Sequence, residues 1–227
     1  MDFNISNKWV FSIGGVEIWI TETIVNMWWI MLFLIVVAVI TRIKLKNFKD
    51  VPKGFQNVLE MMVETFDNLV RGVAGEKFMF LGNWYFMVFS FVLLSNLSGL
   101  VFLRPPTADW SFTFTLALVT FVLIQSMAVK FRKGEYLKSL FEPYPVFFPL
   151  NVIGELARPV SLSFRLFGNI LAGIILLSLL YENVILRFVL PIPLHGFFDV
   201  FAGILQTYVF CVLSLSFISA AAKAGSD

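Results

Sequence analysis

One arginine, Arg165, lies inside a mostly apolar run of the sequence, 159–181. A charged side chain at the centre of a bilayer costs about 2.5–3.5 kcal/mol on insertion scales, and arginine, unlike lysine, cannot escape that cost by losing its proton. Snorkelling to an interface explains Arg165 poorly, because apolar residues continue for several turns on its C-terminal side. We therefore expect Arg165 to face a carboxylate, a water-filled cavity or a partner subunit.

Polar and small residues share a helical face with this arginine. Ser161 precedes Arg165 by four positions and Asn169 follows it by four, and residues four apart lie on one face of a helix. Ala172 and Gly173 extend the stripe, and small residues let another helix come close. The pattern predicts a helix face with polar side chains around Arg165 and small side chains toward its C-terminal end. Such a face suits a partner that moves past it or packs closely against it.

The last apolar run carries a second set of polar residues. Asp199 and Gln206 are seven residues apart, which places them two turns and roughly 10 Å apart on one face. A buried amide such as that of Gln206 needs a partner. Simple solvation at a span end and a role in an ion channel explain Asp199 equally well. His195 stands in a proline-bounded connector and is expected to be an interfacial loop residue rather than a proton relay.

Two further polar sites complete the candidate ion path. Asn96, inside the run 84–103, either lines an outer aqueous path or only packs helices. Glu155 and Arg158 are three residues apart and so able to pair, which indicates a wetter cytoplasmic end for the segment that carries Arg165.

Membrane helices must position these residues, since the 227-residue chain is 59% hydrophobic and 14% charged. We expect an all-α integral membrane protein with a single membrane domain, 1–227, and no alternating-strand pattern. Uncharged runs of about 18 residues or more cross the hydrocarbon core of about 30 Å. The predicted membrane helices are 24–41, 84–103, 111–129, 145–182 and 197–222.

Two of the predicted helices have unusual features. An unbroken helix over 145–182 would be roughly 57 Å long, so it must tilt steeply or break. Between the first two spans, apolar residues at helical spacing predict an amphipathic helix over 53–74, lying on the cytoplasmic surface or against a partner.

Basic residues in the loops predict the orientation, because cytoplasmic loops are rich in lysine and arginine. The loops after the first and third spans are basic, whereas the connector 104–110 carries one basic residue. We expect the N-terminus outside and the C-terminus in the cytoplasm. The basic loop residues are Arg42, Lys44, Lys46, Lys49 and Lys53, then Lys130, Arg132, Lys133 and Lys138.

Several classes of site are not expected. No G-x-x-x-x-G-K-[ST] phosphate loop occurs, so we expect no ATP site and no catalytic site in this chain. A single cysteine, Cys211, provides neither a disulfide nor a zinc site. We expect no cofactor, no metal site and no nucleic-acid partner. The N-terminal residues lack the basic region of a cleavable signal or transit peptide.

The run from Arg158 to Gly173 reads Arg-Pro-Val-Ser-Leu-Ser-Phe-Arg-Leu-Phe-Gly-Asn-Ile-Leu-Ala-Gly. It closely resembles the signature of ATP synthase subunit a, approximately R/K-P-x-S-L-x-x-R-L-F-G-N-x-x-A-G. The resemblance extends over most of the chain, through the amphipathic helix, the polar turn at 94–97 and Gln206 in the final helix.

The resemblance implies an ion-translocating stator subunit of a bacterial F-type ATP synthase, multi-pass in the plasma membrane. Its partners would be the rotating ring of c subunits, the b subunits of the peripheral stalk, the rest of the synthase and the bilayer. Two half-channels would reach the ring from opposite sides, and Arg165 would separate them. The last two membrane helices would lie strongly tilted along the ring.

The motif departs from the family pattern at one point. Many members carry a glutamate directly after the final Ala-Gly, where this chain has Ile174, and many have a histidine or an acid at the position of Asp199. We expect Asp199 to supply the ionisable group that Ile174 lacks.

Two alternatives stay open on the sequence alone. A secondary transporter would bind an anionic substrate at Arg165, and it predicts paired halves with broken helices. A non-conducting scaffold would not need an arginine in mid-span. Within the favoured function, the sequence does not decide between protons and sodium ions, because the carboxylate site of the ring determines the ion.

Overall fold

The protein is described from a computed structural model, which covers residues 7–13, 16–45, 53–101, 103–141, 144–182 and 190–223. Within those ranges, five helical segments are long and apolar enough to cross a membrane: Glu22–Lys44, Glu76–Val101, Trp110–Arg132, Pro145–Tyr181 and Pro191–Ala222. Helices suit this environment because lipid offers no hydrogen-bond partner to a free backbone. The expected all-α membrane fold is confirmed, with one small hairpin added.

The hairpin pairs β1 (Asn7–Ile13) with β2 (Val16–Thr21) in antiparallel fashion. The expectation that the chain shows no strand pattern was wrong for this segment. Its strands contain several β-branched and aromatic residues, which favour extended backbone, but the run is too short to stand out beside the membrane helices.

The first membrane helices are joined by side-chain contacts at one end. Helix α1 (Glu22–Leu45) packs against α3 (Gly82–Leu97) and against the short helix η3 (Pro106–Ala108). Asn26 Nδ2 donates a hydrogen bond of 3.0 Å to the carbonyl of Arg104. Helix α4 (Trp110–Arg132) begins where the Asp109 side chain accepts from the backbone N–H of Ser111 at 3.0 Å.

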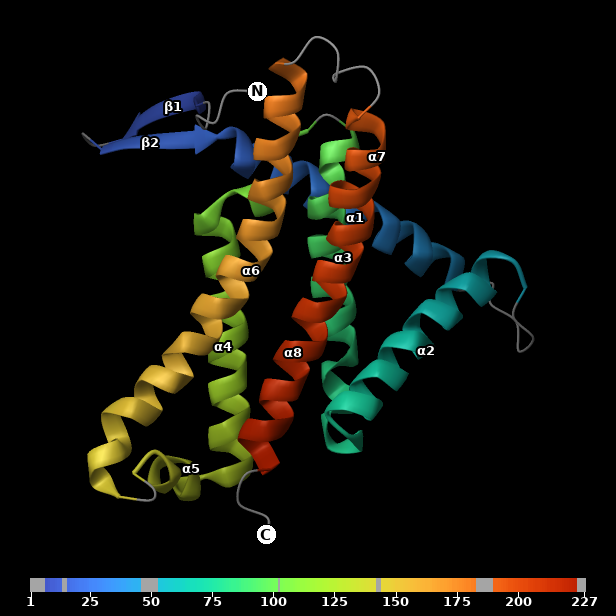
Figure 1. Ribbon diagram of the computed structural model, residues 1–227. Coiled ribbons are helices and arrows are strands. Elements are labelled where there is room, and N and C mark those ends of the chain that lie inside the picture. Colours follow the sequence, from blue (N-terminus) through green and yellow to red (C-terminus); the bar gives the residue numbers. More distant parts are fainter. Residues whose placement is uncertain are drawn as a thin grey trace.

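Helix α2 (Phe55–Val73) lies within the amphipathic segment predicted over 53–74. Its C-terminal half buries Phe66 and Val70 against α3 and α8, whereas Phe55 and Val58 are exposed. In Figure 1 α2 stands apart from the main bundle and slants beside it. A 3-10 helix, η1 (Glu76–Leu81), then leads into α3.

Helix α6 (Phe148–Glu182) is the longest element, with 35 residues, and it follows the short helix η4 (Pro145–Phe147). At 1.5 Å per residue it is roughly 52 Å long. Pro159 lies inside it without ending it. Figure 1 shows the first part of α6, in yellow, slanting across the bundle and the later part, in orange, running more steeply. Its main packing partner is α4.

The final membrane segment is continuous from Pro191 and so begins earlier than the predicted 197–222. It consists of α7 (Pro191–His195), a π-helical stretch η6 (Gly196–Ala202) and α8 (Gly203–Lys223). Helix α8 packs against α4, α3 and α6. Its buried residues, among them Phe210, Leu215 and Ile218, join those of α3 and α4 in the hydrophobic core.

The bundle has two distinct ends in Figure 1. The hairpin, the C-terminal end of α6 and α7 lie at one end, and α5 (Gly134–Ser139) lies with the end of α8 at the other. Because α6 runs from the α5 end to the α7 end, it places Glu155 near α5, Tyr181 near α7 and Arg165 between them.

Candidate functional site

Arg165 points away from the rest of this chain. Its side chain is exposed on α6, and it makes no hydrogen bond or ion pair with any residue that the structure describes. Phe164, beside it, is 54% exposed. Apolar side chains one to three turns away on the same helix are also exposed, namely Leu156, Val160, Ile175 and Leu176. The arginine therefore stands alone on an apolar surface, as the sequence predicts for a residue that meets a partner subunit.

The residues four positions away partly share this surface. Ser161 is exposed and Asn169 is half-buried. Ala172 is also exposed, but Gly173 is buried inside the chain, where a Cβ atom would come within 3.0 Å of Phe198. The expectation that Gly173 belongs to the partner-facing stripe was wrong, because this glycine lets α6 approach η6 instead.

Gln206 is buried, with 6% of its surface exposed, and its Nε2 has no hydrogen-bond partner among the described residues. An unpaired buried amide N–H is costly, of the order of 1–3 kcal/mol. Such a group is retained where a partner from outside the chain satisfies it, or where it has a functional role.

A chain of three polar side chains lies where α6, α7 and η6 meet. Tyr181 Oη lies 3.2 Å from His195 Nε2, and His195 Nδ1 lies 2.5 Å from Asp199 Oδ2. The expectation that His195 is a loop residue was wrong. It ends a helix that continues into η6, and both of its ring nitrogens have partners.

The Asp199 carboxylate is closely confined by the 3-10 helix η2 (Ser98–Val101), which directly follows α3. A Cβ atom at Gly99 would come within 3.2–3.4 Å of both carboxylate oxygens and the carbon between them. Asp199 also lies in the π-helical stretch, and π-helical turns occur frequently at functional sites. Glycine at position 99 thus leaves room for a carboxylate in a fixed place.

Asn96 is fully buried and uses both ends of its amide. Nδ2 donates to the carbonyl of Gly203 and to Thr207 Oγ1, both at 3.0 Å, and Oδ1 accepts from Thr107 Oγ1 at 2.8 Å. Of the two roles left open for Asn96, this geometry favours helix packing, since the amide ties α3 to η3 and α8.

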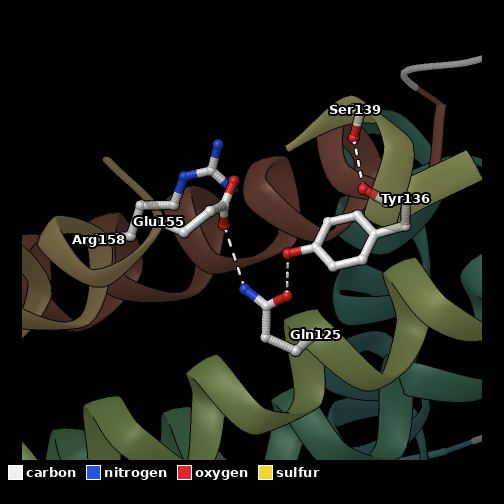
Figure 2. Close-up of polar contacts among 5 residues, drawn as sticks. All are labelled: Gln125, Tyr136, Ser139, Glu155 and Arg158. Atoms are coloured by element: carbon white, nitrogen blue, oxygen red, sulfur yellow. Dashed lines mark hydrogen bonds and ion pairs between the residues drawn. The ribbon is translucent and has the colours of Figure 1, made fainter. Parts of the chain in front are cut away.

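A second polar cluster lies at the α5 end of the bundle, opposite α7 in Figure 1, and Figure 2 shows its side chains. Glu155 Oε2 accepts from Arg158 Nη1 at 2.9 Å and from Gln125 Nε2 at 3.1 Å, and Gln125 Oε1 accepts from the hydroxyl of Tyr136. The predicted pairing of Glu155 with Arg158 is confirmed. The cluster joins α4, α5 and α6.

Tyr136 is a neutral donor in this cluster. Burial raises the pKa of the Tyr136 phenol above its ordinary value, and the nearby Glu155 carboxylate raises it further. The hydroxyl consequently keeps its proton at neutral pH. Arg158 also lies over the ring of Phe217, 5.3 Å from its centre, which connects the cluster to α8.

A family model described as ATP synthase A chain matches residues 24–219. The chain belongs to this ATP synthase subunit family. It is 37% identical over 225 residues to a protein named ATP synthase subunit a, sodium ion specific, from Propionigenium modestum, covering 88% of this chain and 73% of that one. The family's function is ion translocation by the stator of the membrane sector, and the secondary-transporter alternative is not favoured.

Two further members of the family are similar over nearly their whole length. ATP synthase subunit a of Moorella thermoacetica is 35% identical over 216 residues, covering 92% of this chain and 94% of the relative. ATP synthase subunit a of Legionella pneumophila subsp. pneumophila is 32% identical, covering 94% and 91%.

Several residues in these clusters carry no local sequence signal for their role. Gln125, Tyr136 and Tyr181 come from helices distant in sequence from their partners, so no local pattern marked them. The spacing of His195 and Asp199, four apart on helical backbone, was a usable signal. The prolines before His195 favour a loop as much as a helix start, which hides this spacing in the sequence.

Proposed function

We propose that Arg165 separates two half-channels that open on opposite sides of the membrane and meet the c-ring at the exposed face of α6. The observation that carries this proposal is the isolated, outward-facing guanidinium on an apolar surface. It would attract an ionised ring carboxylate and prevent ions from crossing directly between the two paths. An ion must then travel around the ring, which turns the rotor.

The two polar clusters support one path on each side of Arg165. Glu155 lies ten residues before Arg165 and Tyr181 lies sixteen after it, or roughly 15 Å and 24 Å along the helix. On the outer side the path would pass Asp199 and the unpaired Gln206. The contact of Phe198 with Gly173 places the segments of Asp199 and Ile174 side by side, which supports the exchange of ionisable positions.

On the cytoplasmic side the path would run past Ser161 toward Glu155, and Asn169, four residues after Arg165, would border the outer path. Asn96 would hold α3 against α8 beside the outer path without lining it. This arrangement assumes that the chain lies in a bacterial plasma membrane with its N-terminus outside and its C-terminus in the cytoplasm. The c-ring, the b subunits and the remaining synthase subunits are the proposed partners.

The experiment that tests this proposal changes the arginine. Arg165→Ala should abolish ion-driven ATP synthesis in vesicles, and Arg165→Lys should fail as well, because a desolvated lysine can deprotonate and lacks the planar fork. Both variants should still insert. The matched control is Arg71→Ala on α2, an exposed arginine, which should retain normal rates. Normal synthesis in either Arg165 variant would contradict the proposal.

A further inference from the structure

We propose that the corner where α1 ends and α2 begins is a binding site for an anionic phospholipid. This α1–α2 corner consists of three exposed basic residues, Arg42, Lys44 and Lys53, and of the exposed apolar side chains beside them on both helices. The inference does not depend on the ion path, and it assigns a ligand to a part of the chain that lies away from Arg165.

A contact between Lys44 and Phe55 joins the two helices at this corner. The Lys44 ammonium lies over the Phe55 ring, 4.8 Å from its centre, at the last turn of α1 and the first turn of α2. An ammonium has three N–H donors, so a ring on one side leaves others free for an anion. Arg42 and Lys53 are exposed on either side of this contact. The connector 46–52 lies outside the described residues and forms no part of the site.

The three cations have no acidic partner among the residues that the structure describes. The one acid of α1, Glu22, stands in its first turn, at the opposite end of the helix. The first turn of α2 has no acid, and the nearest one, Glu60, accepts a hydrogen bond from Gln56 Nε2 at 2.8 Å. The positive charge of the corner is therefore left for an anion from outside the chain.

Exposed apolar side chains continue from these cations along both helices. On α1, Ile40 lies one turn before Lys44 on the same face, and Ile43 is 65% exposed. On α2, Phe55 and Val58 are three residues apart and both exposed. A surface with cations at one level and hydrocarbon beside them matches a molecule with an anionic head and acyl chains.

The placement of the corner puts it at the level of lipid headgroups. In Figure 1 α1 and α2 meet at the right-hand edge of the molecule, and α2 runs back across the direction of α1. A bilayer that α1 crosses thus has the amphipathic α2 along its surface. Of the five described spans α1 is also the least covered by the chain, with 17% buried against 33–50% for the others.

A phospholipid fits this surface better than a soluble anion or another membrane helix. A soluble anion makes no use of the apolar side chains. A membrane helix covers the apolar side chains, but it leaves the three cations desolvated unless it brings acids to the same level. Anionic leaflets, in contrast, attract basic residues directly beside a membrane helix and supply acyl chains at the same place.

The test is photo-crosslinking of the whole synthase in phosphatidylcholine vesicles that contain a trace of photoreactive phosphatidylglycerol. Peptide mass spectrometry locates the crosslinks, and unlabelled phosphatidylglycerol competes with the probe. We expect crosslinks at the α1–α2 corner, and few from a photoreactive phosphatidylcholine with the same chains. Each basic residue beside an anionic surface strengthens binding about fivefold. The triple variant Arg42→Gln, Lys44→Gln and Lys53→Gln should therefore bind phosphatidylglycerol on the order of 100-fold more weakly.

The matched control removes the same charge from the other basic loop, by Lys130→Gln, Lys133→Gln and Lys138→Gln. Crosslinks at the α1–α2 corner should be unchanged in this control. If the first triple variant fails to insert, a pair of single variants decides. Lys44→Arg keeps the charge and the ring contact and should bind as the wild type does, whereas Lys44→Gln should bind about fivefold more weakly.

Several outcomes would overturn the inference. They are equal crosslinking by the phosphatidylcholine probe, equal losses in both triple variants, and competition by soluble glycerol phosphate, which would indicate a headgroup site without acyl chains. Unchanged lipid crosslinks in the first triple variant, together with loss of another synthase subunit on purification, would show that the corner binds protein instead. Arg165→Ala should crosslink normally, so failure of the proposed ion path would leave this test intact.

Discussion

The two ends of the molecule each hold one carboxylate of the candidate ion path, but they hold it by different partners. Glu155 is bound by Arg158, a cation at every physiological pH, and by the neutral amide of Gln125. Asp199 is bound by a histidine, His195, a residue type whose charge ordinarily changes near neutral pH.

We call the α5 end, where an arginine binds Glu155, the fixed end. We call the α7 end, where a histidine binds Asp199, the switchable end. The arginine keeps Glu155 in the same charged arrangement, so the α5 end mainly holds α6 in place. Imidazole is a type of group that ordinarily takes up and releases protons near neutral pH, so under the proposed function the α7 end is the one suited to proton exchange. Glu155 and Asp199 would thus play different parts, because Glu155 is paired with an arginine and Asp199 with a histidine.

The largest expected effect lies at the switchable end. Asp199→Asn keeps size and hydrogen bonding but removes ionisation, and we expect passive ion flux to fall on the order of 100-fold. Adding Ile174→Glu should recover part of the flux, since a carboxylate would return on the facing helix. Flux through vesicles stripped of the catalytic head is the measurement.

Asp109→Asn provides the matched control for this change. Asp109 also lies near the α7 end of the bundle, but it caps α4, and asparagine caps a helix equally well. Its flux should be normal. Full conductance in Asp199→Asn would remove the difference between the two ends and leave Asp199 as a solvated residue.

A smaller effect is expected at the fixed end. Arg158→Ala leaves the partly buried Glu155 without its charged donor, which should lower stability by about 1–2 kcal/mol. The double variant Arg158→Ala with Glu155→Gln should be more stable than Arg158→Ala alone, because no carboxylate is left unpaired. Thermal unfolding in detergent measures both. Equal stability of the two variants would show that the pair does not hold α6.

The smallest effect concerns the hydroxyl of Tyr136. Tyr136→Phe removes one hydrogen bond to Gln125 and should cost about 1 kcal/mol of stability without changing ion flux. Tyr144→Phe is the matched control, since Tyr144 is 68% exposed whereas Tyr136 is 8% exposed. A change in the pH dependence of flux in Tyr136→Phe would mean that the fixed end also exchanges protons.

The sequence predicted the membrane helices, the amphipathic segment and the pairing of Glu155 with Arg158, because each depends on local spacing or local hydrophobicity. It did not predict that Gly173 contacts Phe198 or that Asn96 bridges three elements. Those contacts depend on how helices distant in sequence pack together. The assignment of His195 failed for a different reason, since prolines are tolerated in the first turn of a helix as well as in loops.

Pro159 in α6 has a mechanical consequence. A proline inside a helix lacks the N–H that would bond the carbonyl four residues earlier, here that of Glu155. The helix is therefore weakest at the segment where Glu155 and Arg158 bind α4, through Gln125, and α8, through Phe217. These side-chain contacts brace α6 at the position where its backbone lacks a hydrogen bond. A stator helix must resist torque from its rotor. In α6 the side chains of Glu155 and Arg158 supply the stiffness that the backbone lacks at Pro159.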